Sequence, residues 1–331
     1  MTDKKQTAQN GIALAKNLLA KWGTVLFIVL MLLLFSCAMP GTFLQVSNFV
    51  TILRNISITT VAAMAITCAV AVGGFDLSLG STVTLADAVV MSLLVWYGCS
   101  TGVSIIVALL SVLVVGLVNG LLIVKFRVDD TLATLASMFI FAGVAMTYSG
   151  GGAISANMTH NGKTALAEVP AAFKAIGQTP WIIIIMLVVV AVMHVFLSKT
   201  KYGRYMYAVG GNREAAELAG IPVGKYRVLA YVLSAFFSGI AGVMLCSRVG
   251  SFQINAGEAY LMPAIAAAFI GESVGGVGKA NAIGTFVGAV LIGILENGLI
   301  MMSVPYYALN IVKGIVLAFA LALTFFRQHK S

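Results

Sequence analysis

The chain has 331 residues, of which 60% are hydrophobic and 9% are charged, and its formal net charge is +9. A soluble domain has about 25% charged residues, so this composition excludes a water-soluble globular protein. Apolar runs of about 20 residues match a hydrocarbon core of about 30 Å. Such runs must be helical, because backbone polar groups find no water inside a bilayer. We therefore expect an all-α polytopic membrane protein.

The apolar runs follow one another along the chain and predict about ten transmembrane helices. The first run carries no charge from Trp22 to Met39, and no small-residue cleavage site follows it. We therefore interpret it as a span and not as a signal peptide. A single transmembrane domain is expected over 22–326, with a segment 1–21 before it and a tail 327–331 after it. The predicted spans are 22–40, 50–72, 78–97, 102–124, 131–149, 180–197, 226–247, 260–274, 281–302 and 306–326.

Lysine and arginine gather in four segments that share one side of a ten-span topology. The positive-inside rule makes this side cytoplasmic, so we expect both termini in the cytoplasm. The longest cytoplasmic segment is then 198–227, and the longest loop on the opposite side is 150–179. Topology explains the net charge, which gives no reason to invoke nucleic acid. The cations of the cytoplasmic side are Lys4, Lys5, Lys16, Lys21, Lys125, Arg127, Lys199, Lys201, Arg204, Arg213, Lys225, Arg227, Arg327 and Lys330.

The stretch VGGFDLSLGSTVT (72–84) lies where the second apolar run ends and the third begins, and it contains two glycines, a carboxylate and several hydroxyls. The glycines break the helix and free backbone groups, which Asp76, Ser78 and their neighbours can satisfy locally. Asp76 is a candidate N-cap of the third span, accepting a backbone N–H two or three residues on. The alternative is a contact with a transported solute or a gate, because intramembrane ionisable groups are usually functional. We favour the cap, since the orientation places Asp76 toward the cytoplasm.

Two segments of the chain are similar to each other, VVGLVNGLLI (114–123) and LIGILENGLI (291–300). Each follows a glycine-rich segment, at 73–81 and 275–284. Paired, Gly-interrupted segments in two halves indicate structural repeats around a transport pathway. The simpler explanation is that small residues let membrane helices approach closely. Asn119 and Asn297, which align when one residue is inserted, either bond between helices or line the pathway.

The most informative polar stretch is KYGRYMYAVGGNREAAELAGIPVGKYR (201–227). Asn212 can cap a short helix REAAELA, and Glu214 in its first turn suits the positive end of the helix dipole. Gly220 offers a left-handed stop, and Pro222 prevents continuation. We expect a compact cytoplasmic helix of about two turns. It is either an ordinary surface loop or a docking element whose small residues allow close seating in a partner's groove.

These stretches carry a resemblance to a known family. The segments that carry it are, in chain order, GGFDLSLGS, GLVNGLLIVKFRVDDTLATLASM, YGRYMYAVGGN, GGNREAAELAGI, and IGTFVGAVLIGILENGL with the following NIVKGIVLA. The chain resembles, over residues 45–325, the permease subunits of bacterial ABC importers for simple sugars, in the ribose/xylose/galactose group. Two segments depart from that pattern. Glu272 stands in IGESVGGVG where a glycine is expected, and Asp129 and Asp130 stand where proline or apolar residues are usual.

The resemblance implies a monosaccharide permease of the bacterial inner membrane, with ribose or a related sugar as its substrate. It implies two cytoplasmic ATP-binding subunits, a periplasmic sugar-binding protein, and a second permease that is an identical copy or a paralogue. ATP and Mg would then be bound by the ATPase, and this chain would bind no cofactor and catalyse no reaction. The expected ATPase-coupling residues are Gly211, Asn212, Glu214, Ala215, Ala216 and Gly220. The pathway or helix-break candidates are Asp76, Ser78, Asn119, Thr134 and Asn297.

Other functions leave weaker signals in the sequence. An ion-coupled secondary transporter needs a carboxylate within the membrane, and Asp87 and Glu296 are the candidates, although Glu296 could instead pair with Lys313. The segment GESVGGVGKA (271–280) lacks the glycine spacing and the Ser or Thr of a phosphate-binding loop. The four cysteines show no C-x-x-C spacing, and the three histidines are scattered. The sequence therefore predicts no metal site and no catalytic group.

Overall fold

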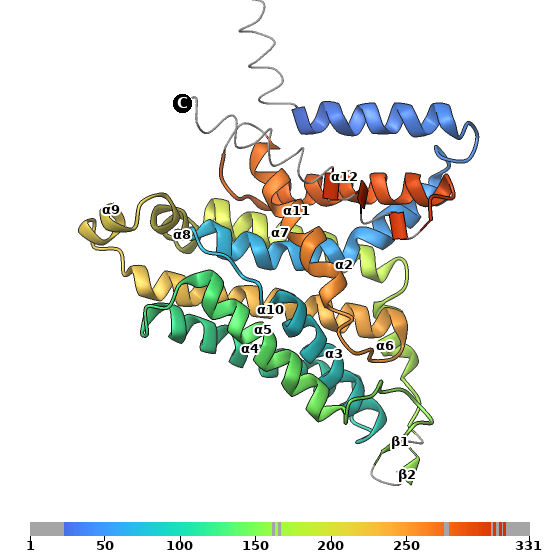
Figure 1. The fold of residues 1–331 in the computed structure, drawn as a ribbon, viewed down its shortest axis with the longest axis horizontal. Helices are drawn as coiled ribbons and strands as arrows, with labels where there is room; N and C mark the ends of the chain where they lie inside the picture. Colours follow the sequence, from blue (N-terminus) through green and yellow to red (C-terminus); the bar gives the residue numbers. More distant parts are fainter. Residues whose placement is uncertain are drawn as a thin grey trace, which may run out of the picture. The chain divides into compact units, whose positions relative to one another are not determined.

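The computed structural model describes residues 23–160, 163–164, 167–274, 278–305, 307–308, 311–312 and 314–315. The described chain is almost entirely helical (Figure 1). A helix at Gly23–Ala38 comes first. The helices that follow are α2 (Val46–Ala71), α3 (Leu79–Val95), α4 (Thr101–Val124), α5 (Asp130–Tyr148), α6 (Ala171–Ile176), α7 (Trp181–Lys199), α8 (Lys201–Gly211), α9 (Arg213–Leu218), α10 (Val223–Val249), α11 (Glu258–Ser273) and α12 (Ala282–Met301).

Each predicted span up to residue 302 coincides with a helix whose ends differ from the prediction by a few residues. Among the described residues, six helices are long and apolar enough to cross a membrane: α2, α4, α5, α7, α10 and α12. The helices Gly23–Ala38 and α3 are apolar but shorter. The chain is therefore a multi-pass membrane protein. Most of the predicted span 306–326, the segment 1–21 and the tail 327–331 lie outside the described residues.

The structure divides into two compact units. Unit 1 comprises 1–53 and 266–331, and unit 2 comprises 54–265. Helices α2 and α11 each contribute to both units. In unit 1, α11 and α12 pack closely, since a Cβ on Gly284 would lie 2.1 Å from the carbonyl oxygen of Gly271. Gly288 makes a similar approach to Ala267. Small residues at helix contacts are the usual device for such packing in membranes.

The centre of unit 2 is α10, which packs against both α3 and α4. Glycines allow these helices to approach closely. A Cβ on Gly242 of α10 would lie 2.5 Å from the carbonyl oxygen of Val83, and a Cβ on Gly116 of α4 would lie 2.6 Å from that of Tyr231. The same three helices supply most of the buried side chains of one hydrophobic core cluster in this unit. Substitutions at these glycines would force the backbones apart, so packing fixes the positions of α3, α4 and α10.

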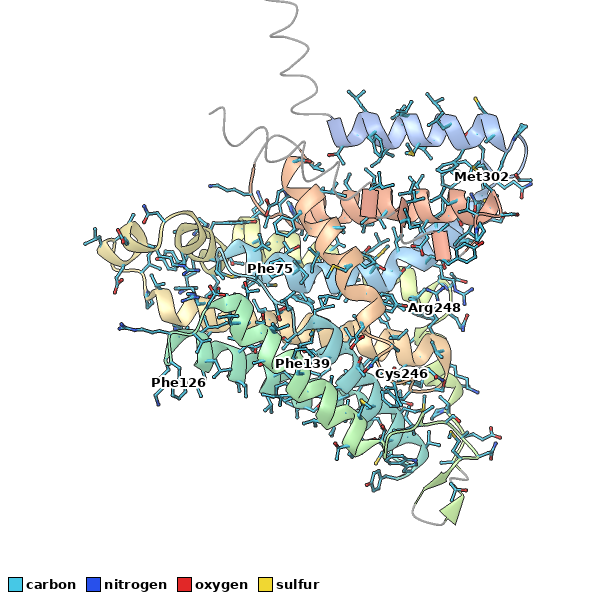
Figure 2. The ribbon with its side chains drawn as sticks, viewed as in Figure 1. Phe75, Phe126, Phe139, Cys246, Arg248 and Met302 are labelled. Atoms are coloured by element: carbon cyan, nitrogen blue, oxygen red, sulfur yellow. The ribbon has the colours of Figure 1, made fainter. Side chains whose placement is uncertain are left out.

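The two ends of unit 2 have different structures. At one end lie α8, α9 and the turn between α4 and α5, and at the other lie α6 and the loop 150–170 (Figure 1). Figure 2 shows Phe126 at the first end and Arg248 at the second. The loop contains the two-residue strands β1 (Thr159–His160) and β2 (Lys163–Thr164), which pair antiparallel. The rest of the described chain has no further strand, as expected for an all-α membrane protein.

Candidate functional site

The helix break predicted between the second and third spans is present between α2 and α3. Residues 72–78 are non-helical, and Figure 2 shows Phe75 within this stretch. Gly73 has a φ of +68°, a left-handed conformation that side chains with a Cβ seldom adopt. The amide of Gly74 still donates to the carbonyl of Ala69 at 2.9 Å. The glycine pair therefore ends α2 and redirects the chain toward Asp76.

Asp76 is buried and accepts three hydrogen bonds at the start of α3. Its Oδ1 accepts from the backbone N–H of Ser78 at 2.9 Å and from the Ser78 hydroxyl at 2.6 Å. Its Oδ2 accepts from the hydroxyl of Ser234 on α10 at 2.6 Å. The residue directly before α3 is Ser78, whose side chain makes no capping bond, so Asp76 is not in the N-cap position. Its predicted bond to a backbone N–H two residues on is nevertheless present, at Ser78. Asp76 thus stabilises the non-helical stretch just before α3 and joins it to α10 by a hydrogen bond.

Two further candidates, Asn119 and Thr134, contact the same break. The Nδ2 of Asn119 on α4 donates to the Ser78 hydroxyl at 2.9 Å. The hydroxyl of Thr134 on α5 accepts from the N–H of Leu77 at 3.1 Å and donates to the carbonyl of Asp130 at 2.8 Å. All of these side chains are buried. Tertiary structure therefore gathers four of the five predicted pathway or break residues around 76–78, by contacts from α4, α5 and α10.

The fifth candidate, Asn297, belongs to unit 1. Its Nδ2 donates to the Oδ1 of Asn48 at 2.8 Å, which joins α12 to the first part of α2. This contact is an interhelical hydrogen bond, whereas Asn119 bonds from α4 to Ser78 in the non-helical break. The two asparagines lie in the second halves of α4 and α12, as the similarity of their segments suggested.

The predicted short helix in the segment 198–227 is α9. The side chain of Asn212 accepts from the N–H of Ala215 at 2.9 Å, and Glu214 lies in the first turn. Gly220 has a φ of +77° and ends the helix before Pro222. These local features are confirmed. The structure adds α8, which the sequence interpretation missed, although Gly203, Met206 and Val209 are buried at helical spacing.

The predicted coupling residues differ in their accessibility. Ala216 is 4% exposed and packs inward, so it is not available to a partner. The neighbouring Leu218 is 91% exposed at the end of α9, where a large apolar side chain has no contact to bury it. Sequence reasoning did not single out Leu218, although it was the large apolar residue in a segment rich in Ala, Gly and Glu. The exposed coupling candidates are Gly211, Asn212, Glu214, Ala215 and Gly220.

The segment of α8 and α9 lies directly against the helix break. A Cβ on Gly210 would lie 2.4 Å from the carbonyl oxygen of Ala71, so glycine is required for this approach. The Nη2 of Arg213 donates to the carbonyl of Gly73 at 3.2 Å. The same Nη2 lies 3.7 Å from Oδ2 of Asp130. The predicted docking helix and the predicted break therefore form one continuous junction.

Asp130, at the start of α5, is the centre of the charged groups in this junction. Its Oδ1 is paired with Nη2 of Arg227, and its Oδ2 accepts from the hydroxyl of Tyr231 at 2.7 Å. Both partners lie on α10, and the side chains of Asp130 and Arg227 are each 13% exposed. A Cβ on Gly74 would lie 2.4 Å from the Tyr231 hydroxyl oxygen and 2.5 Å from Oδ2 of Asp130. We call Asp130, Arg213, Arg227 and Tyr231 the junction cluster.

The sequence contains one signal for this cluster. Asp130 departs from the pattern of similar proteins, and Arg227 is one of the cations that predict topology. A half-buried acidic residue at the start of a span needs a cationic partner, because an unpaired charge there is costly. The pairing of Asp130 with Arg227 follows from that requirement, but its location beside Gly74 does not.

The carboxylates proposed for ion coupling lie apart from this junction. Asp87 of α3 is buried, and its Oδ1 has no hydrogen-bond partner among the described residues. Glu296 of α12 is half-buried, and its proposed partner Lys313 lies outside the described residues. Within the described chain, no three His, Cys, Asp or Glu side chains are grouped as metal ligands would be. Residues 275–277 of the glycine-rich segment are also outside the described part.

Comparison with known proteins gives consistent matches over nearly the whole chain. Residues 48–321 match the family described as "Branched-chain amino acid transport system / permease component". The ribose import permease protein RbsC of Bacillus subtilis (strain 168) is 34% identical over 327 residues, which cover 97% of this chain and 98% of that protein. No solved structure matches the chain significantly.

Relatives named for other sugars are similar over comparable lengths. The galactose/methyl galactoside import permease protein MglC of Escherichia coli (strain K12) is 31% identical over 319 residues, or 92% of this chain and 94% of that protein. The xylose transport system permease protein XylH of Haemophilus influenzae (strain ATCC 51907 / DSM 11121 / KW20 / Rd) is 29% identical over 349 residues, or 88% of this chain and 92% of that protein.

Proposed function

This chain belongs to the family described as "Branched-chain amino acid transport system / permease component", and from this membership we propose that it is the permease subunit of an ATP-driven monosaccharide importer. Relatives that align along almost their full length are named for ribose, galactose and xylose, and this supports a sugar as the substrate. Ribose or a related pentose is the first candidate. The chain is a transport subunit and not an enzyme.

Residues 22–326 form one permease domain of ten spans in two structural repeats, set in the bacterial inner membrane with both termini in the cytoplasm. The distribution of lysine and arginine supports this orientation. So does the separation of the two ends of unit 2: the 125–129 turn and α9 share one end, and the 150–179 loop occupies the other (Figure 1). The positions of Asn119 and Asn297 in α4 and α12 support the repeats.

A cytoplasmic ATP-binding subunit docks on α9. The observation that carries this proposal is Leu218, an apolar side chain that is 91% exposed at the tip of a short, doubly capped helix. Fully desolvated apolar anchors in a partner's pocket are the usual source of binding energy at interfaces. ATP and Mg are bound by that subunit, and this chain binds no cofactor.

The remaining partners contact other faces of the permease. A periplasmic sugar-binding protein docks at the end of unit 2 that carries the 150–179 loop. A second permease, an identical copy or a paralogue, completes the pathway. In unit 2, α5 leaves Leu132, Phe139 and Ile140 exposed, an apolar face that lipid or this second permease covers.

Transport follows from the position of the junction between α9 and the break. When ATP closes the ATPase pair, α9 is displaced and carries with it the chain that contacts Gly73. The break at 72–78 is fixed to α4, α5 and α10 by side-chain hydrogen bonds. Displacement of α9 therefore tilts these helices together and changes the side to which the pathway opens, as in other alternating-access transporters.

Reconstitution tests the function directly. Proteoliposomes that contain this chain, its ATPase and the sugar-binding protein are given labelled ribose, xylose or galactose, with ATP on the ATPase side. We expect uptake of at least one of these sugars that requires both ATP and the binding protein and is unaffected by a proton gradient. Uptake by this chain alone, driven by a proton gradient, would instead establish a secondary transporter that uses Asp87 or Glu296.

A further inference from the structure

Arg213 is the first residue of α9, and its side chain leaves the helix to make two contacts. Its Nη2 donates to the Gly73 carbonyl at 3.2 Å and lies 3.7 Å from Oδ2 of Asp130. The Arg213 side chain is 45% exposed, whereas that of Asp130 is 13% exposed. A guanidinium suits this position because it is always charged and presents several N–H donors, so one terminal nitrogen can approach both acceptors. Arg213 therefore joins α9 to both α5 and the end of α2.

The rest of the junction cluster remains paired without Arg213. Asp130 keeps Arg227 and the Tyr231 hydroxyl, which both lie on α10. The exposed Arg213 contact is a weak one that forms and breaks at low cost in water. The more buried pair of Asp130 and Arg227 is expected to persist, because separating such charges is expensive. Among the cluster's side chains, Arg213 alone belongs to α9.

The two acceptors of Arg213 are connected to opposite ends of the 72–78 break. Gly73 lies near the start of the non-helical stretch, which continues to Asp76 and Ser78. Asp130 begins α5, and one turn later the Thr134 hydroxyl accepts from the N–H of Leu77. A displacement of Arg213 thus acts on the start of the break through Gly73 and on its end through α5.

We propose that Arg213 is a positioning residue that links α9 to the 72–78 break. Through this link, movement of α9 is transmitted to Asp76 and to its hydrogen bonds with Ser78 and Ser234. This inference rests on the proposed function, in which α9 meets the ATPase. It assigns to Arg213 a role within the permease, distinct from the docking surface around Leu218. The charge of Arg213 is directed inward, to Gly73 and Asp130, and does not serve as a contact for the ATPase.

The test compares Arg213→Gln with Arg204→Gln in the complete complex of permease, ATPase and binding protein. Arg204 is a matched control: it is an exposed arginine on α8 whose side chain contacts the carbonyl of Lys199 in its own segment. For Arg213→Gln we expect the amount of sugar taken up per ATP hydrolysed to fall about fivefold, the factor that corresponds to about 1 kcal/mol, the upper range for an exposed ion pair. Arg204→Gln should retain the ratio of the unaltered complex.

Two results would overturn the inference. One is an equal ratio of uptake to hydrolysis in the two variants. The other is loss of the ATPase from pull-downs with Arg213→Gln, which would make Arg213 a docking residue.

Hydrogen exchange of the full-length permease in detergent provides a readout that needs neither sugar nor ATP. Peptides covering 72–78 should exchange faster in Arg213→Gln than in Arg204→Gln, because the break has lost one of its fastenings. Equal hydrogen-exchange rates of these peptides in the two variants would refute a link between Arg213 and the break. If the unaltered complex shows no ATP-driven uptake, the proposed function fails, and this exchange measurement still decides whether Arg213 fastens the break.

Discussion

Replacing Asp76 by alanine removes an acceptor that three buried donors share. Those donors are the Ser78 N–H, the Ser78 hydroxyl and the Ser234 hydroxyl. A buried donor left unsatisfied costs about 1–3 kcal/mol, and each lost hydroxyl bond adds about 0.5–1.5 kcal/mol. The hydroxyls can rotate toward other acceptors, whereas the N–H cannot. The contributions sum to about 2–6 kcal/mol, so we expect Asp76→Ala to lower the free energy of unfolding by about 2–6 kcal/mol, toward the lower end if the hydroxyls find other acceptors.

An exposed aspartate of the same chain provides the control. Asp129 caps α5 by accepting from the N–H groups of Thr131 and Leu132 at 2.9 and 3.3 Å, but it is solvent-exposed. Water can replace those bonds, so Asp129→Ala should cost only about 0.5–2 kcal/mol. Thermal unfolding in detergent and abundance in membranes should rank Asp76→Ala below Asp129→Ala.

Asp76→Asn distinguishes a structural brace from a pathway contact. The amide oxygen can still accept from Ser78, and the amide nitrogen can donate to the Ser234 hydroxyl oxygen once that hydroxyl rotates. We expect near-normal abundance and near-normal sugar uptake per molecule. Normal abundance combined with lost uptake in Asp76→Asn would show that the carboxylate itself acts in transport, and the bracing argument would be wrong.

The remaining predictions concern α9, the junction cluster and the energy source. Leu218→Asp should abolish pull-down of the ATPase while permease abundance stays normal. Ala216→Asp should instead lower permease abundance, because Ala216 is only 4% exposed. Equal pull-down of the ATPase by Leu218→Asp and the unaltered chain would contradict the docking proposal. Arg227→Ala should destabilise the protein by about 3 kcal/mol, because it leaves Asp130 without its paired cation. Tyr231→Phe should destabilise it by about 1.5 kcal/mol, because one hydrogen bond to a carboxylate is lost. A lower thermal stability of Tyr231→Phe than of Arg227→Ala would contradict this order. Collapsing the proton gradient in proteoliposomes should leave uptake unchanged, whereas omitting ATP should abolish it.

Local sequence was enough to predict most helices and the form of α9. Each apolar run specifies a helix because the bilayer offers its backbone no other partners. The ends of α9 are equally local: Asn212 bonds to an amide three residues on, and Gly220 adopts the left-handed conformation that ends the helix. Such features depend on residues within a turn or two of one another, so they can be read without knowing the fold.

The bond of Asp76 to α10 and the junction cluster were decided by tertiary structure, whereas the bonds of Asp76 to Ser78 are local. Asp76 bonds to Ser234, 158 residues away, and Arg227 pairs with Asp130 across 97 residues. The sequence marked Asp76 as a cap for α3, but packing of α10 against α3 turned it into a buried brace between helices. The sequence identified Arg227 only as one of many cations on the predicted cytoplasmic side. Spacing along a chain fixes which residues share a helix face, whereas only the packing of separate helices determines which polar groups are buried together and must pair.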